Sequence, residues 1–301
     1  MQIQILPEKL RRLEIPGRIE MVNGCGGLPL VKVRTPWSAA EVYLLGAHVA
    51  GFQKNGEPPL LFMSAKSCFA PGKAIRGGVP ICFPWFGNHE GEPSHGFARI
   101  ADWELVKTAA APDGAVTLHF ALPQLPGRAV WQSLRTEFVV TVSETLTMEL
   151  TATNDACGET FELENCLHTY FQIGDIGQIS LTGLQGAAFD DFAAGANGAR
   201  RPGSDAALKI TQETNRVYPD NISTVEIHDA SLKRTIRVEK SNSQSTVVWN
   251  PWTTQKLPDD FDPAEHAQMV CVESGNVKQN RLSLAPGTAA ALKVVLSSAA
   301  I

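Results

Sequence analysis

The sequence predicts an all-β fold, a large antiparallel β-sandwich with few short helices. Apolar and polar residues alternate with a period of two along many short segments, which is the pattern of half-buried strands. Glycine (25) and proline (19) are plentiful among the 301 residues, as the turns between short strands require. With 44% hydrophobic and 19% charged residues, the chain can bury a large core.

The clearest strands are expected at 134–142 and 145–153, where apolar residues occupy every second position. A short helix is expected at 6–13 and a single helical turn at 262–266. The Gly- and Ala-rich stretch 186–203 predicts a long surface loop that covers a site. We find no internal repeat and no linker, so residues 1–301 are expected to form a single domain. Further strands are expected at 18–21, 31–33, 41–45, 103–106, 115–122, 234–238, 246–249, 269–272 and 290–296.

The charge and the absence of targeting patterns restrict the partners and the location of the protein. A net charge of -5 and a pI near 5.8 argue against nucleic-acid binding, which requires a basic face. A small phosphorylated ligand needs only two or three well-placed cations. The segment 1–4 lacks the profile of a signal peptide, and no apolar stretch approaches the ~20 residues that span a bilayer. We therefore expect a cytoplasmic protein with no membrane partner.

The cysteines do not indicate a metal site. None of the six belongs to a CxxC pair, and no Cys/His group has the spacing of a zinc site. Cys82, Cys166 and Cys271 lie in apolar, strand-like runs, so buried reduced thiols are expected. We expect neither a metal nor a cofactor.

The segment 73–87 (KAIRGGVPICFPWFG) is the first of four that could carry chemistry. The paired glycines after Arg76 would let the backbone approach a ligand closely, and the prolines would stiffen the loop. The alternative is an ordinary crossover loop with Arg76 in solvent.

His95 and Arg99 enclose the second segment, His-Gly-Phe-Ala-Arg. Their side chains would converge on one ligand if the loop curls, and an arginine fork suits a phosphate. The alternative is a turn-capping histidine with an arginine in a surface ion pair.

His168 lies in the third segment, Leu-His-Thr-Tyr-Phe, at the end of a strand expected to begin near Phe161. In a pleated strand it would share its face with Cys166 and Tyr170. It could be a hydrogen-bonded core residue, or a general acid, because imidazole titrates near working pH.

Glu273 ends the fourth segment, directly after the apolar run 269–272. Partial burial would raise the pKa of this carboxyl and make it a better base. The alternative is an ordinary glutamate at the end of a strand that has already reached solvent. Trp249 and Trp252, earlier in the chain, could line a sugar site or belong to the core.

These segments, with Asn-Arg-Val-Tyr at 215–218 and Trp-Asn-Pro-Trp at 249–252, occur in an order that resembles the glucose-6-phosphate 1-epimerase (hexose-6-phosphate mutarotase) family, a branch of the galactose mutarotase-like superfamily. The resemblance runs from about residue 18 to residue 296. It implies a single super-sandwich domain with its site on the concave face of one sheet, and a reaction that needs no metal or cofactor.

The resemblance also implies the role of each site residue. His168 would be the catalytic acid and Glu273 the catalytic base in opening and closing the sugar ring. Arg76 and Arg99 match the positions that grip the 6-phosphate, and His95 the position that contacts the sugar or its ring oxygen. Ser94 stands where some members have Gln, and Asn215 where the family usually has Asp; both are expected to bind substrate, with consequences for its identity.

The implied partner is a small-molecule hexose 6-phosphate, bound by a monomer. Two other readings are an aldose 1-epimerase acting on unphosphorylated sugar, which would leave Arg76 and Arg99 without an anion, and a non-catalytic sugar-phosphate-binding protein. A glycosidase needs two carboxylates that flank the scissile bond, and only Glu273 has a suggestive setting.

Overall fold

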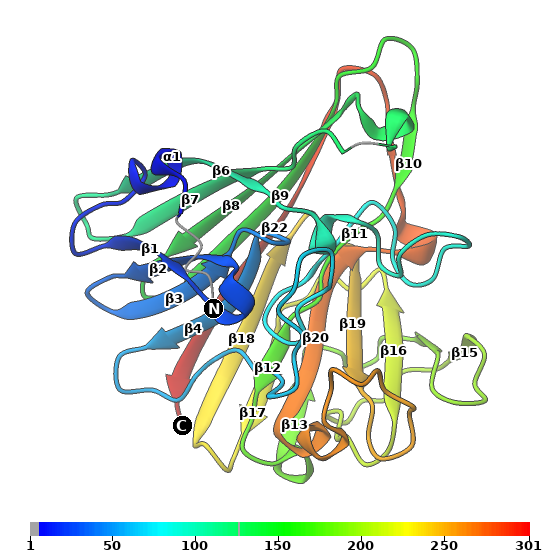
Figure 1. The fold of residues 1–301 in the computed structure, drawn as a ribbon. Helices are drawn as coiled ribbons and strands as arrows, with labels where there is room; N and C mark the ends of the chain where they lie inside the picture. The colour runs from blue at the N-terminus through cyan, green and yellow to red at the C-terminus, as the bar shows by residue number, and fades with distance from the viewer. Residues whose placement is uncertain (1–5, 126) are drawn as a thin grey trace.

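Strands dominate the computed structural model, which describes residues 6–125 and 127–301 (Figure 1). Residues 1–5, on which the expectation about a signal peptide rests, lie outside this description. α1 (Glu8–Arg11) falls within the helix expected at 6–13, and the turn expected at 262–266 belongs to the 3-10 helix η5 (Pro263–Gln268). None of the helices within residues 6–125 and 127–301 is long and apolar enough to cross a bilayer.

Within the described residues, the strands form four antiparallel sheets, two of which have eight strands each. The long sheet has the order β13-β17-β18-β22-β9-β8-β7-β6, and the site sheet the order β15-β14-β16-β19-β20-β11-β5, with β12 also pairing with β20. A four-stranded sheet has the order β1-β2-β3-β4, and β10 pairs with β21. The strand bounds are β1 Ile19–Asn23, β2 Pro29–Arg34, β3 Ser38–Tyr43, β4 His48–Lys54, β5 Ile81–Cys82, β6 Glu104–Ala110, β7 Val116–Ala121, β8 Leu134–Val142, β9 Leu146–Asn154, β10 Phe161–Leu163, β11 Asn165–Leu167, β12 Tyr170–Gln172, β13 Ile179–Thr182, β14 Phe189–Asp191, β15 Ala199–Arg201, β16 Thr214–Pro219, β17 Val225–Asp229, β18 Arg234–Ser241, β19 Ser245–Asn250, β20 Met269–Asn276, β21 Leu282–Leu284 and β22 Ala289–Ala300.

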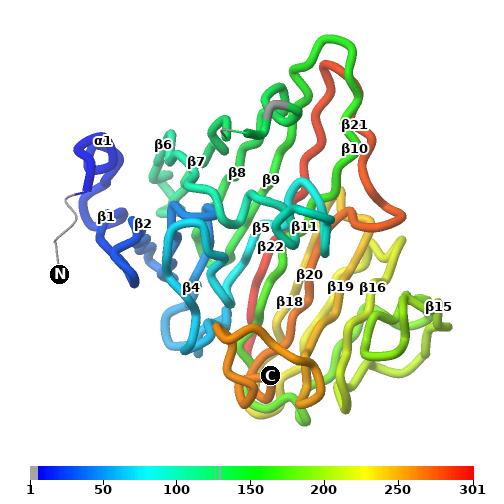
Figure 2. Tube along the Cα trace, turned by 45° about the vertical axis from the view of Figure 1, so that its right-hand side comes forward, coloured from blue at the N-terminus to red at the C-terminus, as the bar shows by residue number. Residues whose placement is uncertain are grey.

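The all-β prediction is confirmed, and each strand expected from the alternation corresponds to an observed one. β8 has the expected bounds, and β9 follows it in a hairpin whose register pairs Val142 with Leu146. The alternation did not reveal β4, β13, β16, β17 or β21. The loop expected at 186–203 is only partly a loop, because β14 and β15 form a hairpin within it, at the edge of the site sheet beside β16 (Figure 2).

Alternation along β20 separates the core from the site. Val270 and Val272 belong to the main hydrophobic cluster, which also contains Leu146 and Met148 of β9, so the two large sheets pack face to face. Cys271 and Glu273 point to the opposite face, because successive side chains of a strand alternate. One face of the site sheet therefore builds the core, and the other is available for a ligand. The segment 251–268, which joins β19 to β20, curls past one end of both strands (Figure 2).

The paired glycines of the segment 73–87 serve packing within the protein. A Cβ atom at Gly77 (φ +112°) would lie 2.5 Å from the carbonyl oxygen of Phe62, and one at Gly78 (φ +56°) 2.3 Å from that of Val49. The expectation that these glycines let the backbone approach a ligand is therefore corrected, because the close approach is to neighbouring backbone.

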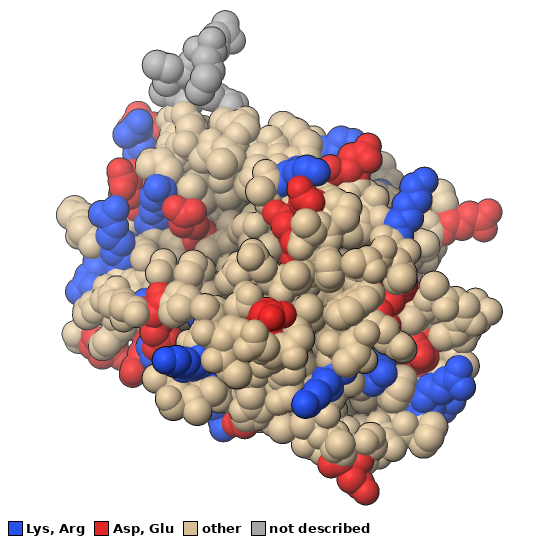
Figure 3. All heavy atoms as spheres, turned by 90° about the horizontal axis from the view of Figure 1, so that it is seen from below, with Lys and Arg blue, Asp and Glu red and all other residues tan. Residues whose placement is uncertain are grey.

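Charged side chains of both signs are interspersed on the face shown in Figure 3, and most of that face is uncharged. No basic stripe gathers among the described residues of that face.

Candidate active site

All seven residues singled out from the sequence line one cavity of about 510 Å³, which has the size of a small-molecule site. The cavity lies against the face of the site sheet that is turned away from the core. The pairing order of β16, β19, β20, β11 and β5 brings these segments together, although they span nearly two hundred positions in the chain. The residues are Arg76, Ser94, His95, Arg99, His168, Asn215 and Glu273.

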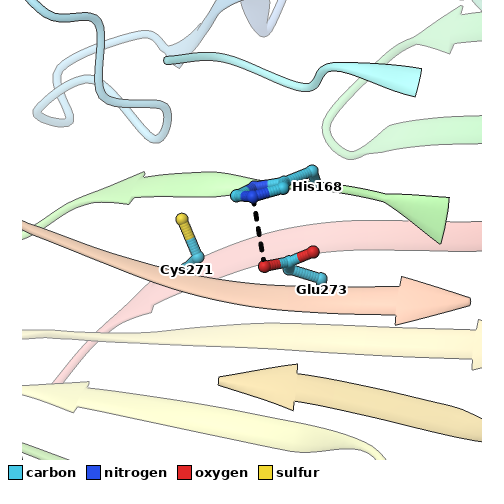
Figure 4. A group of neighbouring side chains, drawn as sticks. All are labelled: His168, Cys271 and Glu273. Carbon is cyan, nitrogen blue, oxygen red and sulfur yellow. Dashed lines mark ion pairs between the residues drawn. The ribbon is translucent and has the colours of Figure 1, made fainter. Parts of the chain in front are cut away.

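His168 and Glu273 meet within the cavity, with Nε2 of the histidine 3.4 Å from Oε1 of the glutamate (Figure 4). Their side chains are 10% and 1% exposed. Glu273 has therefore not reached solvent at the end of its strand, since β20 continues to Asn276.

The expectation of one strand that begins near Phe161 and ends at His168 is wrong, because this stretch is divided between two sheets. β10 pairs in a separate sheet, and His168 lies in a break between β11 and β12.

The break fixes the position of the imidazole. The backbone N–H of His168 donates to the carbonyl oxygen of Pro80 at 3.0 Å. The backbone N–H of Thr169 donates to the carbonyl oxygen of Leu167 at 3.0 Å, which turns the chain at this point. The ring of His168 stacks on Tyr170, with centroids 4.8 Å apart and an interplanar angle of 14°. The face shared with Tyr170 is thus as expected, and the aromatic contact holds the ring in one orientation.

Burial favours the uncharged form of each partner in this pair. It raises the pKa of Glu273 well above its ordinary value. It lowers the pKa of His168 well below its ordinary value, and the nearby His95, Arg99 and Arg76 lower it further. Because the two groups lie within reach of one another, we treat them as a unit that holds one proton, either on the carboxyl or on the imidazole. Such a unit can give a proton to one ligand atom and take one from another.

Two thiols adjoin the pair. Sγ of Cys166 donates to Oε2 of Glu273 at 3.6 Å, and burial raises the pKa of Cys166, which keeps it protonated. Cys271 forms with His168 and Glu273 a group whose ligand atoms lie within 4.8 Å of one another (Figure 4). These residue types can hold a metal ion, and burial raises the pKa of Cys271, so the thiol is protonated when no metal is bound.

His95 presents a hydrogen-bond donor to the cavity. Its Nδ1 accepts from the N–H of Gly87 at 3.3 Å and lies 3.4 Å from Sγ of Cys82. Burial, followed by the fields of Arg99 and Arg76, lowers the pKa of His95 to about 3, so the ring is neutral. A neutral imidazole that accepts at Nδ1 carries its hydrogen on Nε2.

The two arginines of the cavity differ in their partners. Nη2 of Arg99 donates to the carbonyl oxygen of Ser94 at 2.6 Å, while Nη2 of Arg76 lies 3.3 and 3.4 Å from the carboxylate oxygens of Asp260. Neither is a solvated or surface arginine. The Nε atoms of both are buried without a hydrogen-bond partner among the described residues, which leaves donors that an anion could satisfy.

Ser94 and Asn215 have contacts that the sequence did not indicate. The backbone carbonyl of Ser94 orients Arg99, and the side-chain amide of Asn215 lies 3.5 Å from the carbonyl oxygen of Phe192.

The two tryptophans of the segment 249–252 have different environments. Trp249 lines the cavity, whereas Trp252 packs against the main core.

Sequence reasoning missed several residues of this site. Lys278, Phe86 and Phe192 line the cavity, and Asp260 holds Arg76. Phe86 and Phe192 lie in the marked segments 73–87 and 186–203, but nothing singled them out there, while Tyr170 had a signal because it shares a strand face with His168. The segments of Asp260 and Lys278 carry no local pattern that separates them from solvated loops.

The chain matches, over residues 29–297, the protein family described as aldose 1-epimerase. A protein of Salmonella typhimurium is 35% identical over 258 residues, which cover 82% of this chain and 83% of the relative. A protein of Cenchrus ciliaris is 32% identical over 291 residues, which cover 93% of this chain and 87% of the relative. Both carry the provisional name glucose-6-phosphate 1-epimerase.

Solved structures agree with this match. A crystal structure from Salmonella typhimurium, titled provisionally as a mutarotase, superposes with a TM-score of 0.87 at 29% identity, covering 98% of this chain and 99% of that chain. A galactose mutarotase-like protein from Clostridium acetobutylicum has a TM-score of 0.69 at 13% identity, covering 94% and 98%, and shows the common fold alone.

Proposed function

The chain belongs to the aldose 1-epimerase family, whose members are sugar isomerases, and we propose that it interconverts the α and β anomers of a hexose 6-phosphate. One observation carries the proposal. His168 and Glu273 lie 3.4 Å apart in a cavity that also contains two arginines with unpartnered buried donors. An acid and a base are what ring opening requires, and the arginines suit a phosphate.

The reaction begins with Glu273 as carboxylate and His168 protonated. Glu273 takes the proton of the anomeric hydroxyl while His168 gives its proton to the ring oxygen. The bond between C1 and the ring oxygen breaks, and C1 becomes an aldehyde. After rotation about the C1–C2 bond, the 5-hydroxyl adds to the other carbonyl face, its proton returns to His168, and Glu273 reprotonates O1. Positioned proton transfers of this kind contribute about 10²–10⁴-fold.

The charge of the substrate acts on the arginines of the cavity. Burial and the fields of His95, Arg99 and Arg76 lower the pKa of His168, and the field of Arg99 also lowers that of Glu273. A phosphate bound between the arginines would offset their positive charge, which favours the protonated form of His168 that a general acid needs but also raises the pKa of Glu273. A neutral sugar would leave both guanidinium groups without an anion, which supports a phosphorylated substrate over an unphosphorylated one.

The cavity does not favour glycoside hydrolysis. Glu273 is the one carboxylate among the described residues that line the cavity, whereas glycosidases place two carboxylates about the scissile bond.

The proposal includes a cytoplasmic monomer with one domain over 1–301. The hydrophobic core that the sheets share supports the single domain.

Exchange NMR of anomer interconversion tests the proposal directly, on glucose 6-phosphate, glucose and galactose in parallel. We expect catalysis above the spontaneous rate with the phosphorylated sugar and a much smaller effect on the other two. Binding of glucose 6-phosphate without catalysis would instead identify a sugar-phosphate-binding protein, and faster reaction of glucose or galactose an aldose 1-epimerase for unphosphorylated sugars.

A further inference from the structure

Lys278 lines the same cavity and lies just beyond the end of β20, the strand that carries Glu273. It begins the 3-10 helix η6 (Lys278–Asn280), after the buried Val277 at the end of the site sheet. Its Nζ lies 5.9 Å from the ring centroid of Phe86 and 5.7 Å from that of Phe192. The ammonium is thus held near two aromatic rings that come from different loops.

A single carboxylate organises this arrangement. One oxygen of Glu164 accepts a hydrogen bond from the backbone N–H of Lys278, and the other accepts from the N–H of Phe86 at 2.8 Å. Lys278 also has a φ of +57°, a conformation that is uncommon for a residue with a side chain. The backbone of Lys278 is therefore fixed relative to Phe86, and the lysine stem leaves it in a defined direction.

The ammonium of Lys278 forms no ion pair with the carboxylates of the described residues. None of the ion pairs among the described residues includes it, whereas the charge of Arg76 is offset by Asp260. His95 is exposed to the fields of Arg99, Arg76 and Lys278 together, which places all three cations around the same part of the cavity. An uncompensated ammonium beside an aromatic pair, facing a cavity, is a site for an anionic group.

We propose that Lys278 is a specificity-determining residue of this site, which contacts the anionic group of a phosphorylated sugar, and that Glu164 is its positioning residue. This inference rests on the proposed function for the identity of the ligand. It adds an ammonium to the pair of arginines and makes selection for sugar phosphates depend on a residue outside the catalytic motifs.

The test compares Lys278→Met with the wild-type protein by calorimetric titration of glucose 6-phosphate and by anomerisation kinetics. Methionine keeps an unbranched stem beside the rings and removes the charge. We expect Kd and KM for glucose 6-phosphate to rise about tenfold, as for the loss of one charge-assisted contact, with kcat within about twofold. The loss should shrink in 0.5 M salt, should not extend to glucose, and should be largely restored in Lys278→Arg.

Two further variants separate charge at this place from charge in general. Lys293→Met removes an equal charge from an exposed position on β22 of the long sheet, and its Kd should equal that of the wild type. Glu164→Gln keeps one acceptor but replaces the other by an amide donor, so it should raise Kd for glucose 6-phosphate by an intermediate factor.

An unchanged Kd in Lys278→Met, or an equal loss with glucose, would overturn the inference and leave Lys278 as a packing residue. If the wild-type protein binds glucose 6-phosphate with the expected effect of Lys278→Met but does not catalyse anomerisation, the mutarotase proposal fails and this inference stands. If the wild-type protein catalyses anomerisation and Lys278→Met has an unaltered KM, the inference about Lys278 fails and the mutarotase proposal stands. A wild-type protein that binds no sugar phosphate overturns both.

Discussion

The carboxylate of Asp260 lies 3.3 Å from Nη2 of Arg76, so one arginine of the cavity has its charge offset by the protein itself. Arg99, the other arginine, is bound at Nη2 by a backbone carbonyl, and none of the ion pairs in the described part of the chain includes it. A phosphate that binds both arginines must compete with Asp260 for the first of them. The carboxylate holds Arg76 in place, and it would limit the affinity for such a phosphate.

Replacing Asp260 by Asn should tighten the binding of glucose 6-phosphate. The amide is nearly isosteric and can still accept a hydrogen bond from Arg76, but it removes the negative charge. We expect KM to fall about three- to tenfold, the gain from a partly exposed charge near an anion. Steady-state kinetics at low ionic strength measures this. A weaker affinity would show that Asp260 supports the arginine more than it competes for it.

Replacing Glu273 by Gln should remove the base and leave the cavity in shape. We expect kcat for glucose 6-phosphate to fall about 10²–10⁴-fold, because the amide cannot take the proton of the anomeric hydroxyl. Calorimetry should give a Kd close to that of the wild type. Glu20→Gln, at an exposed position of β1, is the matched control and should be fully active. Retention of more than a tenth of the activity in Glu273→Gln would rule out its role as the base.

Replacing Arg99 by Met should separate phosphorylated from neutral sugars. Methionine preserves much of the buried volume but removes the guanidinium, and with it the paired donors for a phosphate. We expect kcat/KM for glucose 6-phosphate to fall about 10–100-fold, while any residual rate with glucose stays the same. The melting temperature checks that the variant is folded. Equal losses for both sugars would indicate that Arg99 shapes the cavity and does not bind phosphate.

The stability of the fold should depend on pH through buried neutral histidines. His48 is buried in β4, its Nε2 has no hydrogen-bond partner in the described structure, and burial lowers its pKa to about 3. In the unfolded chain the pKa returns to ~6.5, so between about pH 6.5 and pH 3 the unfolded state binds more protons. The free energy of unfolding should therefore decrease as the pH falls through that window, by about 1.4 kcal/mol per pH unit for this histidine.

Urea unfolding at pH 4, 5 and 7 measures this dependence. In His48→Gln the slope against pH should be smaller than in the wild type by about the contribution of one histidine, although the variant can be less stable at pH 7. Parallel slopes for the two proteins would show that His48 does not remain neutral in the folded state.

The sequence by itself determined the fold class and singled out residues that meet in one cavity, because both depend on local patterns. Period-two alternation specifies a strand wherever one face is buried, which is why β8 and β9 could be placed almost residue by residue. Four short segments placed His168, Glu273 and the two arginines among residues whose chemistry suits a sugar phosphate. The same reasoning missed β16, whose residues lie in the site sheet with neighbours on both edges and do not alternate cleanly.

Only the tertiary structure decided which side chains are buried and which charges remain without a partner. Glu273 could have ended a strand in solvent. It is buried because β11, β19 and the loop that follows β5, all distant in sequence, enclose it. Asp260 and Lys278 are unremarkable in the sequence, since a loop carboxylate or lysine in water has the same neighbours in the chain as one that faces a cavity. Desolvation and pairing depend on contacts across the fold, and so these properties could not be derived from local sequence.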